Sequence, residues 1–185
     1  MCRDDTTIET MSVTCVNSNP SMEMPRQKDS PAAAIRFDSD SPSTTAKLGE
    51  SLGRVCRAGD VILLIGSLGA GKTCFVKGLA RGMGIRSTVR SPSFVLLARY
   101  PGRVPLAHLD LYRIEGRAAI DDLGLEEQLD DSVIVVEWGD KIGDRWNNVL
   151  HIEFEETGEQ SRRMQVSARG AVAAGRLREW AEASR

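Results

Sequence analysis

The most informative stretch of this chain is Gly66-Ser67-Leu68-Gly69-Ala70-Gly71-Lys72-Thr73, which has the spacing G-x-x-x-x-G-K-T. Glycines at these positions let the backbone turn tightly, so that successive N–H groups point inward at phosphate oxygens. A helix that begins at Gly71 adds the partial positive charge of its N-terminus. In such a loop Lys72 can reach the β- and γ-phosphates of a nucleotide, and the Thr73 hydroxyl can ligate Mg²⁺. The stretch therefore predicts a phosphate-binding loop (P-loop).

The segments on either side of the loop have the patterns of a strand and a helix. Residues 60–65 are expected to form a strand, because the β-forming residues 61–65 make a continuous apolar run that is typical of a strand buried on both faces. After the loop, Phe75, Leu79 and Met83 recur at every fourth position, and Gly84 is placed to end a helix there. A chance glycine-rich turn has no reason to lie between a buried strand and an amphipathic helix, so this context favours a true P-loop.

Strands and helices are expected to alternate along the rest of the chain. A helix capped by Ser41 or Ser43 should place Leu48, Leu52 and Val55 on one face. The other expected elements are strands at 34–37, 94–100, 105–111, 132–137, 149–154 and 164–168, a short helix near 118–128 and a terminal helix over 171–183. This order predicts an α/β fold with a P-loop NTPase-like central sheet flanked by helices on both faces.

The first part of the chain differs in composition from the rest. Residues 1–30 are acidic, contain few large apolar residues and show no hydrophobic period. Such a segment cannot bury enough surface to offset the entropy cost of ordering, so we expect a disordered N-terminal extension. Residues 31–185 are expected to form one domain, since 185 residues are too few for an extension and two full cores.

Charge and cysteine content exclude several classes of protein. Lysine and arginine number 24 against 26 aspartates and glutamates, a net charge of −2, whereas a general binder of nucleic acid or anionic membranes would usually be basic. No apolar run approaches the roughly 20 residues that span a bilayer, so we expect a soluble protein with no membrane contact. The four cysteines form no C-x-x-C pair and only two histidines exist, which argues against disulfides or zinc and favours a reducing compartment.

Two apolar strands end in a carboxylate that could help to hold Mg²⁺ beside the loop. Asp110 lies in His108-Leu109-Asp110-Leu111-Tyr112-Arg113, at the end of one expected strand. Glu137 follows the run Val133-Ile134-Val135-Val136 at the end of another. Carboxylate oxygens suit Mg²⁺, which in P-loop proteins commonly uses an acid at a strand end. The residues alone do not rank the two acids, and either could be an ordinary solvated acid.

Four sequence blocks in series resemble the bacterial TsaE family, the ATPases of tRNA threonylcarbamoyladenosine (t6A) biosynthesis. The blocks are GSLGAGKT at 66–73, SPSF at 91–94, HLDLYR at 108–113 and VVEWGD at 135–140. With TAKLG at 45–49, the resemblance covers about residues 41–168. It implies that residues 31–185 form a cytoplasmic P-loop ATPase domain that binds ATP with Mg²⁺. It also implies weak hydrolysis alone, stimulation in a complex with TsaB and TsaD proteins, and a link to tRNA only through that complex.

The resemblance also assigns roles to individual residues. Thr73 and Glu137 match the Mg²⁺ positions, and Asp110 matches an acid implicated in hydrolysis. Together with Lys72, the two acids are the residues expected to act in catalysis. Trp138 matches a tryptophan near the nucleotide. The residues that match the phosphate cradle are Leu68, Gly69, Ala70, Gly71, Lys72 and Thr73.

Two positions depart from the family's pattern. The family's loop usually begins Gly-Asp-Leu-Gly, whereas Ser67 here removes the carboxylate, so no role of that acid in polarising water or contacting a partner carries over. Residues 91–94 match a mobile loop like the switches of GTPases, where the family usually has Ser-Pro-Thr. Ser93 keeps the hydroxyl of that threonine and loses its methyl group.

Several neighbouring residues have simpler interpretations. Without the family, Trp138 is more often a packing residue than a nucleotide contact. His108 is expected to be structural, and Cys74 to behave as a small buried apolar group. Arg113 could steady a γ-phosphate or pair with an acid such as Glu115. The terminal helix is expected to expose a face of mixed charge made of Arg176, Arg178, Glu179, Glu182 and Arg185.

Two other functions use the same kind of loop. A small-molecule or nucleoside kinase would need an acceptor pocket and an arginine-bearing lid, for which Arg86, Arg90 and Arg99 are the candidates. A GTP-dependent switch would need an N-K-x-D stretch to read guanine, and the sequence contains none, so we discount it. An ATPase that drives or resets a tRNA-modifying complex is therefore the leading hypothesis, with the kinase as the alternative.

Overall fold

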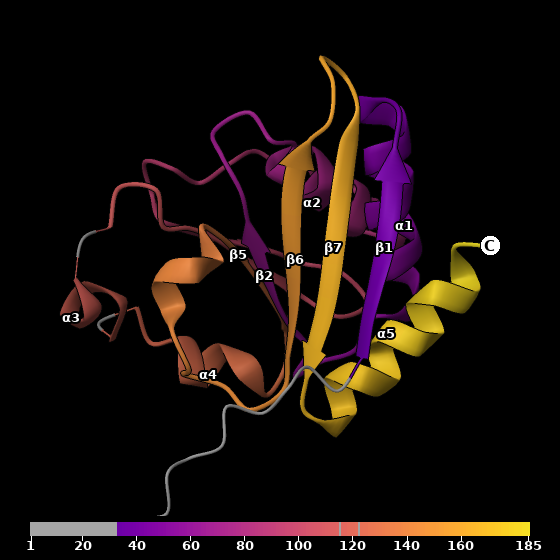
Figure 1. The fold of residues 1–185 in the computed structure, drawn as a ribbon. Coiled ribbons are helices and arrows are strands. Elements are labelled where there is room, and N and C mark those ends of the chain that lie inside the picture. The colour runs from indigo at the N-terminus through magenta and orange to yellow at the C-terminus, as the bar shows by residue number, and fades with distance from the viewer. Residues whose placement is uncertain (1–32, 115, 122) are drawn as a thin grey trace, which may run out of the picture.

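Seven strands form one mixed sheet in the order β1-β7-β6-β2-β5-β4-β3 (Figure 1). The computed structural model describes residues 33–114, 116–121 and 123–185, so the extension expected at residues 1–30 lies outside the described residues. The strands are β1 (Ala33–Ser39), β2 (Val61–Ile65), β3 (Leu97–Tyr100), β4 (Leu106–Asp110), β5 (Val133–Glu137), β6 (Val149–Glu156) and β7 (Arg162–Arg169). The helices are α1 (Pro42–Val55), α2 (Lys72–Gly82), α3 (Arg117–Asp121), α4 (Leu125–Leu129), the 3₁₀ helix η1 (Gly139–Ile142) and α5 (Ala171–Ala183).

The centre of the sheet is parallel, whereas its two sides are antiparallel. β2 pairs in parallel with β5 and β6, and β5 pairs in parallel with β4. β7 joins β6 to β1 in antiparallel pairing, and β3 is antiparallel to β4. The register places Asp110 at the end of β4 beside Glu137 at the end of β5, and Glu137 beside Leu64 of β2. The two candidate acids therefore meet at the edge of the sheet from which the P-loop leaves β2.

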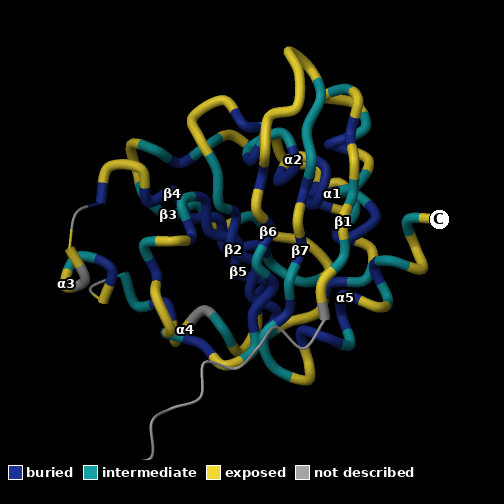
Figure 2. Tube along the Cα trace, viewed as in Figure 1, coloured by how far each residue is buried: buried dark blue, intermediate teal, exposed yellow. Residues whose placement is uncertain are grey.

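Helices cover both faces of the central strands, as the alternating pattern predicts. α1, α2 and α5 pack on one face, over a core that includes Leu64, Phe75 and Trp180. Ile120 of α3 and Leu125 of α4 join the core on the other face, together with η1. Figure 2 shows the buried residues concentrated in the central strands and the exposed ones at the tip of the β6–β7 hairpin. Within the described ranges, no helix is long and apolar enough to cross a membrane.

α1 and α2 approach each other closely because glycines line their contact. A Cβ atom on Gly78 would lie 1.9 Å from the carbonyl oxygen of Ala46, and one on Gly49 would lie 2.2 Å from that of Phe75. Only glycine fits at these two points. Leu52, one of the apolar residues expected on the inner face of α1, is fully buried beside this contact. The tight pair fixes the N-terminus of α2, and with it the P-loop, against the rest of the domain.

Most of the elements expected from the sequence are present. Ser41, rather than Ser43, caps α1, and its Oγ accepts a hydrogen bond from the N–H of Thr44 at 3.2 Å. α2 ends just before Gly84, and α5 has the expected bounds. The central strands lie where the apolar runs predict them. Helices on both faces of a central sheet confirm the predicted fold class.

The strand expected to begin at Phe94 begins only at Leu97. The N–H groups of Val95 and Leu96 both donate to the carbonyl oxygen of Pro92, at 2.9 and 2.6 Å, which makes this segment a turn. Leu96 has a φ of +67°, outside the range that strands adopt. The predicted start was wrong because the apolar side chains of Phe94 and Val95 are exposed at a turn rather than paired in the sheet.

The single helix expected near residues 118–128 is two short helices, α3 and α4. Gly124 lies between them with a φ of +60° and forms the N-cap of α4. Glycine adopts this left-handed conformation without the penalty of a Cβ atom. The break lets Ile120 and Leu125, one from each helix, both turn their side chains into the core.

The charged face expected on the terminal helix is partly buried. Arg176 is only 4% exposed, and its Nε donates to Asp60 Oδ2 at 2.7 Å. Its Nη1 also donates to Glu179 Oε2 at 2.6 Å. Asp60 directly precedes β2, so this ion pair fastens α5 to the start of the central strand. The expectation of a solvated face was wrong at Arg176 because its partner lies far away in the sequence.

Candidate functional site

A cleft of about 320 Å³ lies at the edge of the sheet where β2, β4 and β5 end. The P-loop, the start of α2, the ends of β4 and β5 and the segment before β3 supply its walls. The lining residues are Leu68, Gly69, Ala70, Gly71, Lys72, Thr73, Cys74, Ser91, Ser93, Asp110, Tyr112, Glu137 and Trp138. Every residue that the sequence assigned to phosphate, metal or nucleotide binding thus lies in this one cleft.

The P-loop passes directly into α2. Gly71 is the N-cap of the helix and has a φ of +104°, a conformation that residues with a side chain rarely adopt. Lys72 is the first residue of α2, so the helix begins within one residue of the expected position. The first N–H groups of a helix lack partners within the helix and carry partial positive charge. Because Gly71 to Cys74 line the cleft, this end of α2 is placed to bind an anion.

Lys72 is buried and folded back onto the loop. Its Nζ donates to the carbonyl oxygens of Gly66 and Ser67 at 2.6 and 2.7 Å, and lies 4.2 Å from the centre of the Trp138 ring. Burial lowers the pKa of Lys72 below its usual value, and nearby carboxylates, Glu137 first, oppose that shift. An anion bound in the cleft would further favour the charged form of this lysine.

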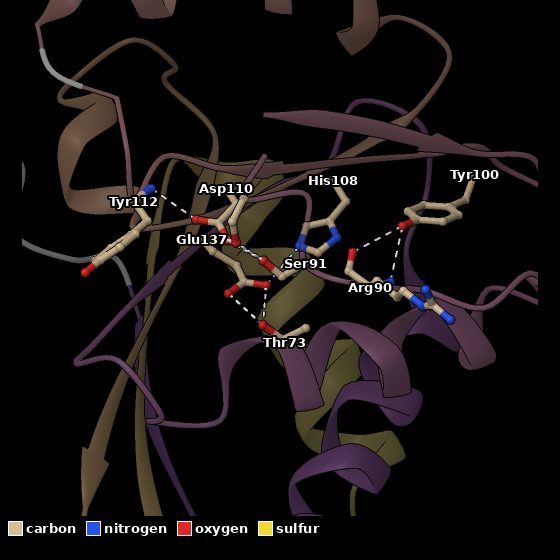
Figure 3. A network of polar contacts seen from close by, with 9 residues as sticks. Thr73, Arg90, Ser91, Tyr100, His108, Asp110, Tyr112 and Glu137 are labelled. Carbon is tan, nitrogen blue, oxygen red and sulfur yellow. Dashed lines mark hydrogen bonds and ion pairs between the residues drawn. The ribbon is translucent and has the colours of Figure 1, made fainter. Parts of the chain in front are cut away.

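The Glu137 carboxylate is held between β4 and α2 (Figure 3). Thr73 Oγ1 lies 2.8 Å from Glu137 Oε1 and 2.9 Å from Oε2, and His108 Nε2 lies 3.0 Å from Oε1. Glu137 and His108 are both buried, at 4% and 0% exposure. In the tautomer that carries its proton on Nε2, His108 donates this hydrogen bond to the carboxylate. His108, expected to be structural, is therefore in direct contact with a candidate metal ligand.

Asp110 has a different set of partners, although its strand is adjacent (Figure 3). Its Oδ2 accepts hydrogen bonds from Ser91 Oγ at 2.5 Å and Ser93 Oγ at 2.7 Å, and its Oδ1 accepts one from the Tyr112 N–H at 3.0 Å. The two serine oxygens also lie in direct contact with each other. Burial by itself would raise the pKa of Asp110, but these hydrogen bonds outweigh burial and lower it. The carboxylate thus fastens the segment before β3 to the end of β4.

The residues that follow β4 and β5 form one wall of the cleft. Trp138 has a φ of +61°, an uncommon conformation for a bulky residue, and follows Glu137 directly. Its ring centre lies 5.2 Å from that of Tyr112. Lys141 Nζ donates to the carbonyl oxygens of Leu111, Tyr112 and Ile114 at 2.8 to 3.0 Å. Sequence reasoning missed Lys141, because only the fold brings its ammonium group to the turn after β4.

The interpretation of Cys74 needs correction, and Arg113 has a neighbour that the sequence did not predict, while Glu115, its candidate partner, lies outside the described residues. Cys74 is half-buried rather than buried, and its Sγ lies 3.2 Å from the carbonyl oxygen of Pro42. Arg113 is exposed and stacks over the ring of Phe94, with 4.2 Å between its Cζ and the ring centre. It therefore contacts the same turn as the serines that Asp110 holds.

The arginines considered for a kinase lid do not line the cleft. Arg86 and Arg90 line a separate groove next to α2. Arg99 forms an ion pair with Asp131, with 2.6 Å between Nη2 and Oδ2. None of the three lines the cleft that holds the P-loop.

The Thr73 hydroxyl and the Glu137 carboxylate suit a magnesium ion better than a metal that takes all of its ligands from protein side chains. The hydroxyl and the buried carboxylate meet at the start of α2. Among the described residues, no three His, Cys, Asp or Glu side chains gather closely enough to hold a metal. Mg²⁺ usually takes one or two protein oxygens and completes its coordination with water and phosphate oxygens. The donor set therefore suits an ion that arrives with a phosphate ligand.

The sheet order, the loop after β2 and the acids at the neighbouring strand ends define a P-loop NTPase-like α/β protein. The family model described as "Threonylcarbamoyl adenosine biosynthesis protein TsaE" matches residues 39–164. The match spans the whole cleft, and it confirms the resemblance carried by the four sequence blocks. The chain belongs to the TsaE family of t6A biosynthesis proteins.

Relatives from several bacteria support this assignment. The chain is similar to the tRNA threonylcarbamoyladenosine biosynthesis protein TsaE of Treponema pallidum, with 45% identity over 109 residues, 58% of this chain and 81% of the relative. It is 39% identical to the Streptomyces coelicolor protein of the same name over 133 residues, 67% of this chain and 90% of the relative. The crystal structure of Bacillus subtilis YdiB matches with a TM-score of 0.72 and 29% identity, over 83% of this chain and 97% of that one.

Proposed function

We propose that this protein binds ATP with Mg²⁺ in the cleft and hydrolyses it within the t6A modification machinery, acting with TsaB- and TsaD-type partners. The observation that carries the proposal is the meeting of the P-loop, Thr73 and both strand-end acids in one cleft. Family membership supports the t6A process. We expect the link to tRNA to be indirect, through the partners, and the protein to act in the cytoplasm.

Lys72 and the start of α2 would hold the phosphates. The lysine ammonium group now donates to two carbonyl oxygens of its own loop, Gly66 and Ser67. When nucleotide binds, these donors would turn to phosphate oxygens, and the exchange replaces neutral acceptors by charged ones. Hydrogen bonds between charged partners are roughly twice as strong as neutral ones. The Trp138 ring beside Nζ would limit the access of water to this contact.

Thr73 and Glu137 would hold Mg²⁺, directly or through a bound water. When bound, this ion polarises the phosphoryl oxygens and neutralises the charge that develops on them. His108 Nε2, which lies 3.0 Å from Oε1, would help to keep the Glu137 carboxylate turned toward Thr73. Such a second contact typically orients a ligand and tunes its affinity for a metal.

Asp110 would act on the hydrolysis step rather than on binding. A carboxylate at this place can orient the attacking water, but its oxygens are already occupied by Ser91, Ser93 and the Tyr112 N–H. Three of the roughly four acceptor sites of this carboxylate are taken, so the serine hydroxyls compete with water for Oδ2 and leave room only at Oδ1. We therefore expect the isolated protein to hydrolyse ATP slowly, and a partner that repositions the segment before β3 to raise turnover.

The apolar residues around the cleft support the participation of a protein partner. Leu68 of the P-loop is 74% exposed, Phe94 and Val95 are 83% and 70% exposed, and Tyr112 is 47% exposed. Leu68 and Tyr112 line the cleft, whereas Phe94 and Val95 follow its serine segment. Large apolar side chains gathered around a polar cleft are typical of a surface that another protein covers.

ATP turnover by the purified protein, alone and with TsaB and TsaD proteins, tests this proposal. We expect slow release of free phosphate alone and a marked increase in the presence of both partners. Rapid turnover that the partners leave unchanged would contradict the coupling. Transfer of phosphate to a small-molecule acceptor, instead of its release, would favour the kinase alternative.

A further inference from the structure

The β6–β7 hairpin holds the P-loop through its last pair of strand residues. Glu156 and Arg162 lie opposite each other in the antiparallel register, at the end nearest the hairpin turn. Glu156 Oε1 accepts a hydrogen bond from Ser67 Oγ at 2.8 Å. Arg162 donates from Nε to the carbonyl oxygen of Ala70 at 3.0 Å and from Nη2 to that of Gly69 at 3.3 Å. One register pair thus contacts the loop on both sides of Leu68.

The same guanidinium group also holds the turn of the hairpin. Arg162 Nη1 donates to the carbonyl oxygens of Gly158, Glu159 and Ser161 at 2.8 to 3.3 Å. Among the described residues no carboxylate forms an ion pair with it, so its charge is shared among backbone oxygens. Arginine suits this task because its planar fork carries five N–H donors in a fixed geometry.

These contacts bear on phosphate binding through the planarity of the peptide bond. In a trans peptide the C=O and the following N–H point in opposite directions. A carbonyl of Gly69 or Ala70 that is turned toward Arg162 therefore turns the next N–H away from it. For Ala70 that next N–H belongs to Gly71, which lines the cleft at the start of α2. The guanidinium also adds positive charge beside a loop that would bind an anion.

We propose that Glu156 and Arg162 are positioning residues that hold the P-loop in its phosphate-binding shape, and that Ser67 is matched to Glu156. An aspartate at position 67 would place a second carboxylate beside Glu156 in this chain. Serine donates a hydrogen bond at the same place. The affinity test of this inference rests on the proposed function, because it assumes that the cleft binds ATP. The hydrogen-exchange test of the loop does not.

Amide hydrogen exchange of residues 66–72 in the nucleotide-free protein tests the contact directly. We expect Arg162→Gln to speed amide exchange in this loop by about tenfold. A change of this size corresponds to the loss of one hydrogen bond whose net stabilisation is near the upper end of the usual range. Arg163→Gln is the matched control, because Arg163 lies next in the same strand and pairs with Asp38 and Glu155 instead. Equal loop exchange in the two variants would overturn the proposal, whatever the nucleotide results.

Affinity for a non-hydrolysable ATP analogue with Mg²⁺ provides the functional measurement. We expect Arg162→Gln to weaken analogue binding by about tenfold and to raise KM for ATP with little change in kcat. Arg162→Lys keeps the positive charge but lacks the planar guanidinium group. Its analogue affinity should therefore lie between those of Arg162→Gln and wild type. A purely structural role would lower Tm in Arg162→Gln while analogue affinity stayed at the wild-type value. That result would overturn the proposal.

The Ser67 contact gives a test that does not depend on the folding of an Arg162 variant. We expect Ser67→Asp to weaken analogue binding by about threefold to tenfold, because two carboxylates then face each other. Adding Glu156→Gln to Ser67→Asp should restore affinity, since a glutamine amide can donate to the new carboxylate. Failure of the second change to restore affinity would contradict the pairing. If even wild type binds no analogue, the proposed function fails, and loop exchange still decides the inference.

Discussion

The ends of β5 and β4 lie side by side in the sheet, yet their acids have different surroundings. Glu137, at the end of β5, is held by the first turn of α2 and by a buried histidine, through Thr73 and His108. Asp110, at the end of β4, is held by the serines of the segment before β3 and by the backbone of the turn that follows it. Both acids are buried, but Glu137 is held by the first turn of α2, whereas Asp110 is held by a turn whose apolar residues are exposed.

This difference suggests how binding and turnover could be separated in one cleft. Oxygens fixed to a helix keep their geometry whether or not a ligand is present, which suits a metal site. Hydroxyl groups on an exposed turn can exchange one partner for another when the turn moves. In the proposed function, the end of β5 would therefore serve ion binding and the end of β4 would control hydrolysis.

Lys72→Ala should have the largest effect, because in the proposed function both acids act on a phosphate that this lysine would hold. We expect ATP affinity and turnover to fall by about 100-fold, since charged hydrogen bonds contribute up to about 3 kcal/mol. Titration with an ATP analogue and a phosphate-release assay measure the two quantities. Lys77→Ala, an exposed lysine on the same helix, is the control. Wild-type affinity in a folded Lys72→Ala variant would contradict the assigned site.

Glu137→Ala should raise the Mg²⁺ concentration needed for turnover. We expect the half-maximal Mg²⁺ concentration to rise by about 100-fold or more, because loss of a group that only supports a metal ligand already costs about 10- to 100-fold. Turnover by the partner complex, measured over a series of Mg²⁺ concentrations, gives the value. His108→Gln, which removes the imidazole donor while keeping a polar side chain, should produce a smaller shift in the same direction. No shift in either variant would break the assignment of the ion to β5.

Asp110→Ala should lower turnover without a comparable loss of binding. We expect kcat in the partner complex to fall by about tenfold or more, because a group that orients water acts in the transition state. KM for ATP should stay within about twofold of wild type. Asp131→Ala, which removes an acid outside the cleft, is the control. An increase in KM with kcat unchanged would place Asp110 in ground-state binding instead.

The smallest expected effect is on the pH dependence of stability. Hydrogen bonds lower the pKa of Asp110 in the folded protein, so the acid stabilises the fold above its unfolded pKa of about 3.9. This contribution is lost as the pH falls through the lower, folded pKa. We expect Asp110→Asn to cost about 1 kcal/mol in urea unfolding at pH 7, and less below pH 4. If the difference in unfolding free energy between Asp110→Asn and wild type grew toward acid pH, it would contradict the hydrogen bonds assigned to Asp110.

Much of the fold and most of the site follow from local sequence patterns. The apolar runs before Gly66 and Glu137 predict the two central strands, and the glycine spacing predicts the loop between β2 and α2. Parallel strands end at the same edge, so acids at those ends meet without any long-range information. For the same reason Lys72, Thr73, Asp110 and Glu137 could be placed in one site from the sequence.

The remaining features depend on contacts between segments far apart in the chain. The turn before Leu97 is fixed partly by the Asp110 N–H, which donates to the carbonyl oxygen of Leu96 at 3.1 Å. Arg176 is buried because Asp60 lies beneath it, and the hairpin arginine Arg162 reaches the P-loop only in the folded protein. In the sequence each of these residues resembles an ordinary surface or strand residue, so no local pattern identifies them.

The central claim is that Glu137 serves ion binding and Asp110 serves hydrolysis. Calorimetric titration of the two alanine variants with an ATP analogue, with and without Mg²⁺, tests it most directly. We expect Mg²⁺ to strengthen binding to wild type and to Asp110→Ala by similar factors, and to give Glu137→Ala little or no gain. Loss of the Mg²⁺-dependent gain in Asp110→Ala, with the gain retained in Glu137→Ala, would contradict the claim and reverse the two roles.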